Sequence, residues 1–182
     1  MIVGLSQRIL YYNNFSYDAL SPAWYTFLSN HTLIAIQNRV DQDFDQLANM
    51  IDSFIITGGD DSPVRRIVEI RLATAMLKQN KPVLGICHGA FLLTELLNGK
   101  VSRCENHFNT FHSVIIGCEK IKVNSFHSLQ IEAPPDTATT LAVDEHGVCE
   151  AWIDNNIASI VWHPERMPLP VVPDEIKRLL KL

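Results

Sequence analysis

The chain has 182 residues, about the size of one domain, and is long enough to bury a core without a disulfide or a metal. Apolar residues make up 47% of it and charged residues 19%, which excludes a disordered chain. Its 15 basic and 20 acidic residues give a formal charge of −5, a poor match for duplex nucleic acid. No apolar run approaches the roughly 20 residues of a membrane span, and the N-terminus lacks a signal-peptide pattern. We therefore expect one cytoplasmic domain over residues 1–182, with no membrane or nucleic-acid partner.

Strands and helices alternate four times in the first hundred residues. Apolar runs predict strands at residues 2–5, 33–36, 54–57 and 83–86, and helical spacing predicts helices at residues 18–28, 44–51, 64–79 and 91–97. Continuous apolar strands joined by helices predict a parallel sheet that is covered on both faces. In the third helix, the predicted buried face consists of Val64, Ile67, Val68, Leu72, Ala75 and Met76.

The second half of the chain reads mainly as strands separated by polar turns. The predicted strands lie at residues 113–116, 120–123, 139–143, 148–153 and 157–162, and a final helix is predicted at 173–182. Several of these strands are expected to be antiparallel additions at one end of the sheet. The predicted fold class is thus α/β: a single domain with a central, mostly parallel sheet flanked by helices, extended by antiparallel strands.

A G-x-C-x-G sequence, Gly85-Ile86-Cys87-His88-Gly89, lies where the fourth predicted strand passes into a helix. Such a sharp turn holds a nucleophile in strained backbone geometry, and side chains two residues to either side would collide, so both positions need glycine. The turn would put the thiol at the carboxyl end of the sheet, and at a helix N-terminus whose dipole favours the thiolate. Cys87 is therefore the candidate nucleophile, and a buried structural cysteine is the alternative.

A thiol nucleophile needs a base, and the base needs an acceptor that orients it. His163 and Glu165 form an H-x-E pair directly after the last predicted strand, so they complete a catalytic triad with Cys87 by residue type. An oxyanion hole needs two backbone N–H donors. We assign these to His88, which follows the nucleophile, and to Gly59, at the end of the preceding strand.

Three motifs in this order resemble those of class I glutamine amidotransferases: Gly-Gly-Asp at residues 58–60, the elbow at 85–89, and Trp-His-Pro-Glu at 162–165. His-Ser-Val at 112–114 and the segment 123–131, which begins Val-Asn-Ser-Phe-His, resemble the γ-glutamyl hydrolase branch of that family. The resemblance implies a flavodoxin-like amidotransferase fold. It also implies a free-standing hydrolase of a small γ-glutamyl amide that releases glutamate through a thioester, without cofactor or metal.

Two positions depart from the family pattern. Many relatives carry glutamine four residues after the nucleophile, where this chain has Phe91, so the polar contact to the glutamyl group is absent or supplied elsewhere. The residue after the nucleophile is His88, where relatives often have Arg, Leu or Tyr. Its side chain is either a ligand contact or a wall of the cleft.

The rim of the cleft should select the leaving group. The predicted substrate-binding residues are Arg8, Tyr11, Asn124, Ser125 and His127. An arginine after the first strand suits a phosphate or carboxylate, although a solvated loop arginine is the alternative. Tyr11 or Tyr12 could stack on a nucleobase. The start of the chain also resembles amidotransferase-like proteins of sugar-nucleotide and capsule pathways, which implies a γ-glutamyl nucleotide phosphoramidate as substrate.

Other functions are compatible with the same motifs. The chain could be a glutaminase subunit that delivers ammonia to a separate synthetase, or a hydrolase of the γ-glutamyl-γ-aminobutyrate type. A non-catalytic binding module on this fold would be expected to have lost a triad residue, whereas Cys87, His163 and Glu165 are all present. A chaperone or deglycase with an elbow cysteine usually takes its acidic partner from an early strand, and so fits less well.

Overall fold

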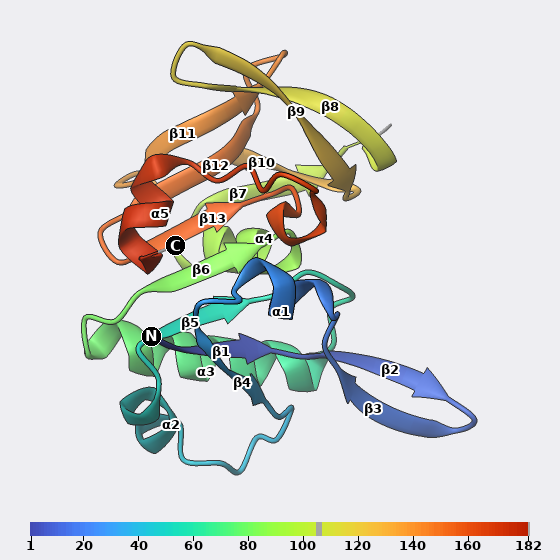
Figure 1. Cartoon of the computed structure of the whole chain (residues 1–182), viewed down its shortest axis with the longest axis vertical. Coiled ribbons are helices and arrows are strands. Elements are labelled where there is room, and N and C mark those ends of the chain that lie inside the picture. The colour runs from blue at the N-terminus through green and yellow to red at the C-terminus, as the bar shows by residue number, and fades with distance from the viewer. Residues whose placement is uncertain (105–106, 182) are drawn as a thin grey trace.

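The structure, a computed structural model, describes residues 1–104 and 107–181. Within these residues the chain forms one α/β domain on an 11-stranded mixed sheet, with a separate two-stranded hairpin beside it (Figure 1). The first half of the sheet is parallel and the second half antiparallel. The predicted fold class is therefore confirmed.

Five parallel strands form one half of the sheet, in the order β4-β1-β5-β6-β13. Their bounds are β1 Ile2–Ser6, β4 Thr32–Ile36, β5 Ser53–Ile56, β6 Val83–Ile86 and β13 Ile157–Ile160. Every residue of β5, β6 and β13 is buried, as expected for parallel strands covered on both faces. Because these strands point the same way, their carboxyl ends meet at one edge of the sheet.

Antiparallel strands continue the sheet from β13 in the order β12-β11-β8-β9. Their bounds are β8 Phe108–Ile116, β9 Glu119–Phe126, β11 Thr139–Asp144 and β12 Cys149–Asp154. Two short strands that the sequence did not predict, β7 Lys100–Arg103 and β10 Leu129–Ala133, pair with each other, and β10 also pairs with β12. The strand β13 joins the two halves, since it is parallel to β6 and antiparallel to β12.

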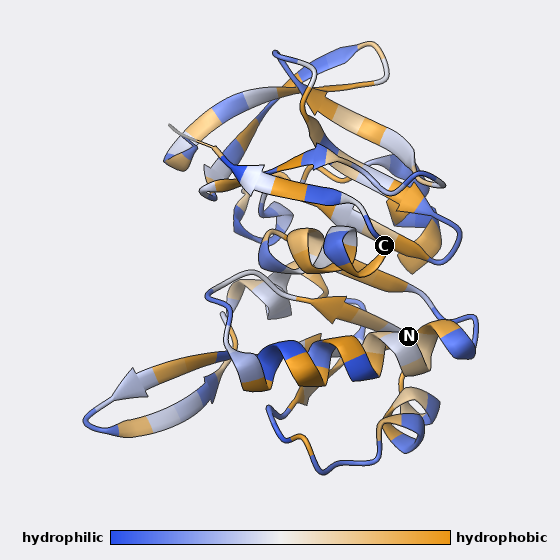
Figure 2. Ribbon diagram, turned by 180° about the vertical axis from the view of Figure 1, so that it is seen from behind, coloured by the Kyte–Doolittle hydropathy of each residue, from blue (hydrophilic) through white to orange (hydrophobic). Residues whose placement is uncertain are grey.

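Helices cover both faces of the parallel half. They are α1 Ala23–Phe27, α2 Phe44–Met50, α3 Pro63–Lys78, α4 His88–Leu96, α5 Asp174–Leu180 and a 3-10 turn, η1, at Pro164–Arg166. Figures 1 and 2, which view the molecule from opposite sides, show α1 and α5 on one face and α3 and α4 on the other. The predicted end of the last helix, Leu182, lies outside the described residues. None of the described helices has the length and apolar character needed to cross a membrane.

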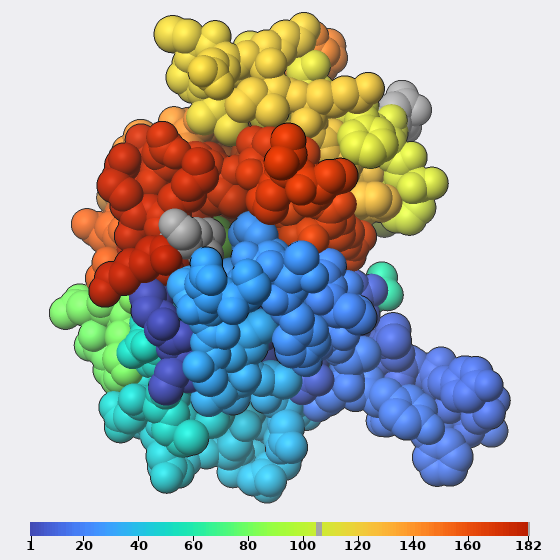
Figure 3. Space-filling model, in the orientation of Figure 1, coloured from blue at the N-terminus to red at the C-terminus, as the bar shows by residue number. Residues whose placement is uncertain are grey.

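The segment after β1 differs from the prediction. Residues 18–28 were predicted as one helix, but Phe15–Ala19 is a strand, β3, which pairs with β2, Arg8–Tyr12. Asn13 and Asn14 form the turn with φ of 48° and 64°, the left-handed conformation that a two-residue hairpin turn requires and that Asn tolerates. The hairpin projects from the body of the molecule as an arm (Figure 3).

The buried face of α3 is rotated from the predicted one. Val68, Leu72, Ala75 and Met76 are buried as predicted, but Val64 and Ile67 are 41% and 43% exposed. Arg65 and Glu69 take the inner positions instead, both fully buried. The prediction failed because it excluded charged residues from the core, whereas these two form an ion pair of 2.7 Å with each other.

Candidate active site

Four neighbouring parallel strands deliver the candidate site residues to one edge of the sheet. Arg8 follows β1, Gly59 follows β5, Cys87 follows β6 and His163 follows β13. The order β1-β5-β6-β13 puts the ends of these strands side by side. All four residues line one pocket of about 490 Å³. This is the crevice beyond the carboxyl ends of the strands where open α/β sheets bind ligands.

The turn between β6 and α4 has the strained geometry predicted from the G-x-C-x-G sequence. Cys87 has φ of 52° and ψ of −101°, an unusual conformation for a residue with a side chain. A Cβ atom on Gly85 would lie 2.3 Å from the carbonyl oxygen of Gly89, and one on Gly89 would lie 2.4 Å from that of Ile56. Both contacts are to backbone, which cannot yield, so both flanking glycines are required.

Burial dominates the chemistry of the Cys87 thiol. It raises the pKa of Cys87 to about 12, and the backbone N–H of His88 and the charge of Arg166 only partly oppose it. The sequence led us to expect that the helix dipole would favour the thiolate. In the free protein the thiol is protonated at neutral pH instead, so a base must take its proton when it attacks.

His163 is held by three contacts. Its Nδ1 lies 2.7 Å from Oε1 of Glu165, and because a carboxylate accepts, Nδ1 carries the proton and Nε2 is free to act as a base. The side chain of Asn124 brackets the His163 backbone, donating to its carbonyl and accepting from its N–H, each at 2.8 Å. A Cβ on Gly58 would lie 2.3 Å from the imidazole, so the absence of a side chain at Gly58 makes room for the ring.

The thiol of Cys87 and the imidazole of His163 face the same pocket without a hydrogen bond between them in the described part of the chain. Catalytic hydrogen bonds are often long before substrate binds. Glu165 is buried beside the ring, and its Oε1 lies 3.4 Å from the guanidinium of Arg166. The thiol and an oriented imidazole thus line one pocket, as proton transfer from sulfur to nitrogen would require.

A buried polar network supports the two loops beside the nucleophile. The guanidinium of Arg65 donates to the carbonyl oxygens of Thr57 and Asp60 and to the carboxylate of Glu69. The other carboxylate oxygen of Glu69 accepts from Nε2 of His88 at 2.8 Å. Burial alone would raise the pKa of Glu69, but the hydrogen bond from His88 and the charge of Arg65 hold it below its usual value. The His88 side chain is thus anchored in the protein.

The five predicted substrate-binding residues occupy three kinds of position. Arg8 and His127 line the pocket. Tyr11 lies on the projecting hairpin, 79% exposed and outside the pocket lining. Asn124 and Ser125 were expected in a loop, but they lie in β9 and are buried, with Asn124 bound to His163 and Ser125 to the carbonyl of His107. Their hydrogen bonds indicate a positioning role for both.

Several lining residues were missed from the sequence. Phe91, Phe108 and Phe126 form apolar walls, and Arg166 adds a second arginine beside Arg8. Arg166 directly follows the H-x-E pair and could have been found from that position. Phe108 and Phe126 could not, because they depend on where β8 and β9 fold over the parallel half. Phe91, on α4, is the residue that the sequence already placed in the family's glutamine position.

Arg8 and Arg166 are neighbouring cationic groups of the pocket, whose lining also contains Asp60, Asp61 and Glu95. Burial lowers the pKa of Arg8, and the nearby charges of Arg166 and Arg65 lower it further. Arg8 forms no ion pair with any residue that the structure describes, whereas Arg66, also in the lining, is paired with Glu95 at 2.7 Å. Arg8, which lacks an ion-pair partner there and lies near a second guanidinium group, is therefore a candidate contact for an anion.

Comparison with known proteins agrees with this geometry. Residues 25–180 match the family model of class-I glutamine amidotransferases, so the chain belongs to that family. A crystal structure of a GMP synthase component from Thermoplasma acidophilum has the same fold, with a TM-score of 0.73 and 16% identity over 98% of this chain and 91% of that one. Family and fold together define an amide hydrolase of the glutamine amidotransferase type.

Two curated proteins are similar along most of their length. The γ-glutamyl-CDP-amidate hydrolase of Campylobacter jejuni is 28% identical over 184 residues, which cover 91% of this chain and 90% of that protein. A glutamine amidotransferase-like protein of Lactococcus lactis is 24% identical, with 74% of this chain and 75% of that protein covered.

The steric fit of the elbow can be tested with alanine at Gly85. Because its Cβ would meet backbone at 2.3 Å, we expect Gly85→Ala to lower the free energy of unfolding by at least about 2 kcal/mol. Urea unfolding measures this loss. The control is Gly117→Asn, at a turn with φ of 60° and no atom within 4 Å of the added Cβ, which should unfold like the parent. Equal midpoints for Gly85→Ala and the parent would show that the turn can relax.

Proposed function

We propose that this protein is a cysteine hydrolase that releases glutamate from a γ-glutamyl amide. The observation that carries the proposal is the strained Cys87 elbow, which shares a pocket with a buried His163–Glu165 pair. A structural cysteine would not need a strained turn, two sterically required glycines and an oriented imidazole across the pocket. Membership of the amidotransferase family supports the same chemistry.

The proposed reaction has two halves. The Cys87 sulfur attacks the γ-carbonyl carbon while Nε2 of His163 takes the thiol proton. The imidazolium, stabilised by Glu165, gives that proton to the departing nitrogen, and the C–N bond breaks to leave a glutamyl thioester. Water, deprotonated by His163, then attacks the thioester, and glutamate leaves as the thiol regains its proton. No electrons are transferred, and no cofactor is required.

The negative oxygen that develops on the γ-carbonyl needs two donors. The backbone N–H of His88 is one, and its interaction with the thiol group shows how close it lies to the nucleophile. The backbone N–H of Gly59, in the pocket lining at the end of β5, is proposed as the other. Arg65 supports both positions, since it binds the carbonyl of Asp60 directly and His88 through Glu69.

For the leaving group we propose a nucleotide phosphoramidate, as in the name of the Campylobacter jejuni relative. Arg8 and Arg166 offer charge-assisted hydrogen bonds to phosphate oxygens. Phe108, which is 72% exposed in the pocket lining, offers a face on which a base can stack, worth about 1–3 kcal/mol. Phe108 replaces Tyr11 and Tyr12 in this role, because those lie on the hairpin arm. The carboxylate of γ-aminobutyrate can also pair with an arginine, but this leaving group has no ring to stack on Phe108 and carries less charge than a nucleotide phosphate.

The nucleophile is tested by Cys87→Ala. We expect kcat for glutamate release to fall at least about 10³-fold, because the members of a triad act as a unit. Cys118→Ala, which removes an exposed thiol, is the matched control and should keep the parent rate. Glutamate release by Cys87→Ala close to the parent rate would refute the mechanism. In the parent, mass spectrometry after rapid acid quench should detect the glutamyl thioester.

The role of Glu165 is tested by Glu165→Gln. Glutamine keeps the volume but loses the charge that stabilises the imidazolium, so kcat should fall by about 10²- to 10⁴-fold. Near-ultraviolet circular dichroism should be unchanged, which separates a catalytic effect from unfolding. Glu132→Gln, on exposed β10 surface, is the control and should be fully active. Full activity of Glu165→Gln would show that His163 does not need a carboxylate partner, and would refute the assigned role of Glu165.

Arg8→Ala tests the choice of leaving group. We expect the parent to have a higher kcat/KM for a γ-glutamyl nucleotide phosphoramidate than for γ-glutamyl-γ-aminobutyrate or glutamine. Loss of hydrogen bonds to a charged phosphate should lower kcat/KM for the nucleotide about 10- to 100-fold in Arg8→Ala and leave glutamine nearly unchanged. Arg39→Ala, which removes an exposed arginine paired with Asp41, is the control.

The other outcomes of this comparison are equally informative. An equal loss on all three substrates would assign Arg8 to the glutamyl half. Equal values in the parent would mean that the pocket does not select the leaving group. A chain that is silent on every substrate alone, but active on glutamine with a synthetase, would be a glutaminase subunit.

A further inference from the structure

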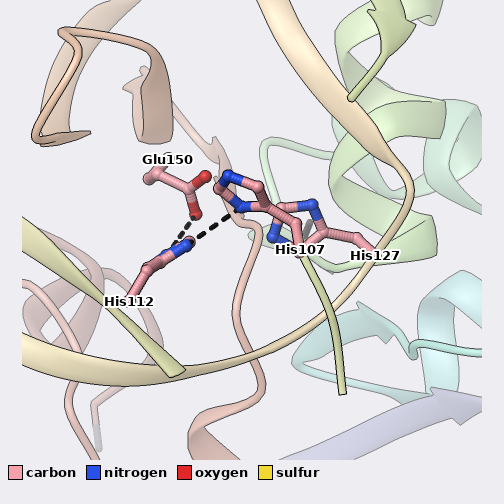
Figure 4. A group of neighbouring side chains, drawn as sticks. All are labelled: His107, His112, His127 and Glu150. Carbon is pink, nitrogen blue, oxygen red and sulfur yellow. Dashed lines mark hydrogen bonds and ion pairs between the residues drawn. The ribbon is translucent and has the colours of Figure 1, made fainter. Parts of the chain in front are cut away.

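Three histidines and a glutamate meet behind the wall of the pocket. His107 precedes β8, His112 lies on β8, His127 lies between β9 and β10, and Glu150 lies on β12. One potential ligand atom from each lies within 4.8 Å of the others (Figure 4). The proposed hydrolysis uses none of these side chains. His127 alone among them also lines the pocket.

The cluster leaves buried polar atoms without partners. Nε2 of His112, Nε2 of His127 and Oε2 of Glu150 have no hydrogen-bond partner among the described residues, although Nε2 of His112 and Oε2 of Glu150 lie 3.5 Å apart, within ion-pair distance when His112 is protonated. His127 and Glu150 are 3% and 1% exposed, so water does not solvate them freely. Unpaired buried polar atoms are rare, and an unpaired buried carboxylate is costly unless it is paired with a cation or coordinates a metal.

A hydrogen bond to the outer ring nitrogen of His127 orients the lone pair of this ring toward the cluster. Nδ1 of His127 lies 2.7 Å from the carbonyl oxygen of Leu129, and because that oxygen only accepts, Nδ1 donates and the neutral ring has its lone pair on Nε2. Nδ1 of His112 contacts Nδ1 of His107 at 3.0 Å, while its Nε2 lies 3.5 Å from Oε2 of Glu150. A ring nitrogen fixed by a backbone carbonyl is the usual support of a metal-binding histidine.

We propose that His107, His112, His127 and Glu150 bind one Zn²⁺ ion. Three imidazole nitrogens and one carboxylate oxygen match the ligands of zinc, whereas Mg²⁺ and Ca²⁺ prefer oxygen alone. A tetrahedral ion with bonds of about 2.1 Å holds its ligand atoms about 3.4 Å apart, so only a small contraction of the cluster is needed. The ion would neutralise the Glu150 carboxylate and give the unpartnered atoms a partner.

The four ligands tie together segments that are far apart in the sequence. The ion would fasten the start of β8 and the loop after β9 to β12 in the main sheet. Phe108, Phe126 and His127 belong to these segments and line the pocket. Four protein ligands leave no open position, which is the pattern of a structural zinc site. The ion would thus fix the pocket wall without taking part in the reaction, and it would be a metal that the sequence did not predict.

The experiment uses the full chain carrying Cys87→Ala, so that the active-site thiol cannot bind zinc. Calorimetric titration of the chelator-treated protein with Zn²⁺ should give one equivalent of tight binding, and zinc should raise the melting temperature. His107→Ala and Glu150→Gln should each raise the dissociation constant for Zn²⁺ at least about tenfold and abolish the rise in melting temperature. His31→Gln, before β4 at the opposite end of the sheet, should bind like the parent.

Two features keep this test decisive. His107 is only partly buried and Glu150→Gln keeps its volume, so both variants should fold, and circular dichroism without metal checks this. Co²⁺ should give the intense visible absorption of a tetrahedral site in the parent and lose it in both variants. The proposal is overturned if the parent binds no zinc, or if the folded variants bind zinc as tightly as His31→Gln. Because activity is not measured, failure here leaves the proposed hydrolysis untouched.

Discussion

The active-site edge of this protein depends on the close backbone contact at the elbow between β6 and α4. Gly85 approaches the carbonyl of Gly89, and Gly89 approaches that of Ile56, at distances that exclude any side chain. This packing forces Cys87 to a φ of 52° and fixes the thiol at the pocket floor. The strain is tolerated because β5, β6 and β13 are buried on both sides and cannot shift.

A second constraint connects the elbow to the rest of the crevice. Arg65 is charged and yet fully buried, and its ion pair with Glu69 is stable only because every polar group around it is satisfied. Through Thr57 and Asp60 it holds the loop after β5, and through Glu69 it holds His88. The same helix face that breaks the hydrophobic pattern of α3 therefore stiffens the loops that carry the proposed oxyanion donors.

The electrostatics of the crevice separate two tasks. Burial raises the pKa of the Cys87 thiol to about 12, so the proposed mechanism relies on His163 to take the thiol proton. Arg8, which has no ion-pair partner among the described residues, and Arg166, which lies 3.4 Å from Glu165, line the same pocket. The phosphate of a nucleotide leaving group would bind to these arginines, and its base would stack on the aromatic wall formed by β8 and β9. In the proposed reaction, the antiparallel half of the sheet contributes part of the aromatic wall, whereas Cys87, His163 and both arginines follow parallel strands.

The sequence by itself determined the parallel strands, the elbow and the order of the candidate triad, because each is encoded within a few residues by apolar runs, glycines or a short motif. Only the tertiary structure decided the rest. Asn124 and Arg65 became internal supports because strand register and ion pairing, which are long-range, overrode their polar character. Tyr11 lies outside the site because the Asn13-Asn14 turn folds its segment into a hairpin. This pair of asparagines is a turn signal that was present in the sequence but was missed. The cluster of His107, His112, His127 and Glu150 has no motif spacing, since three separate segments must pack together before the side chains meet.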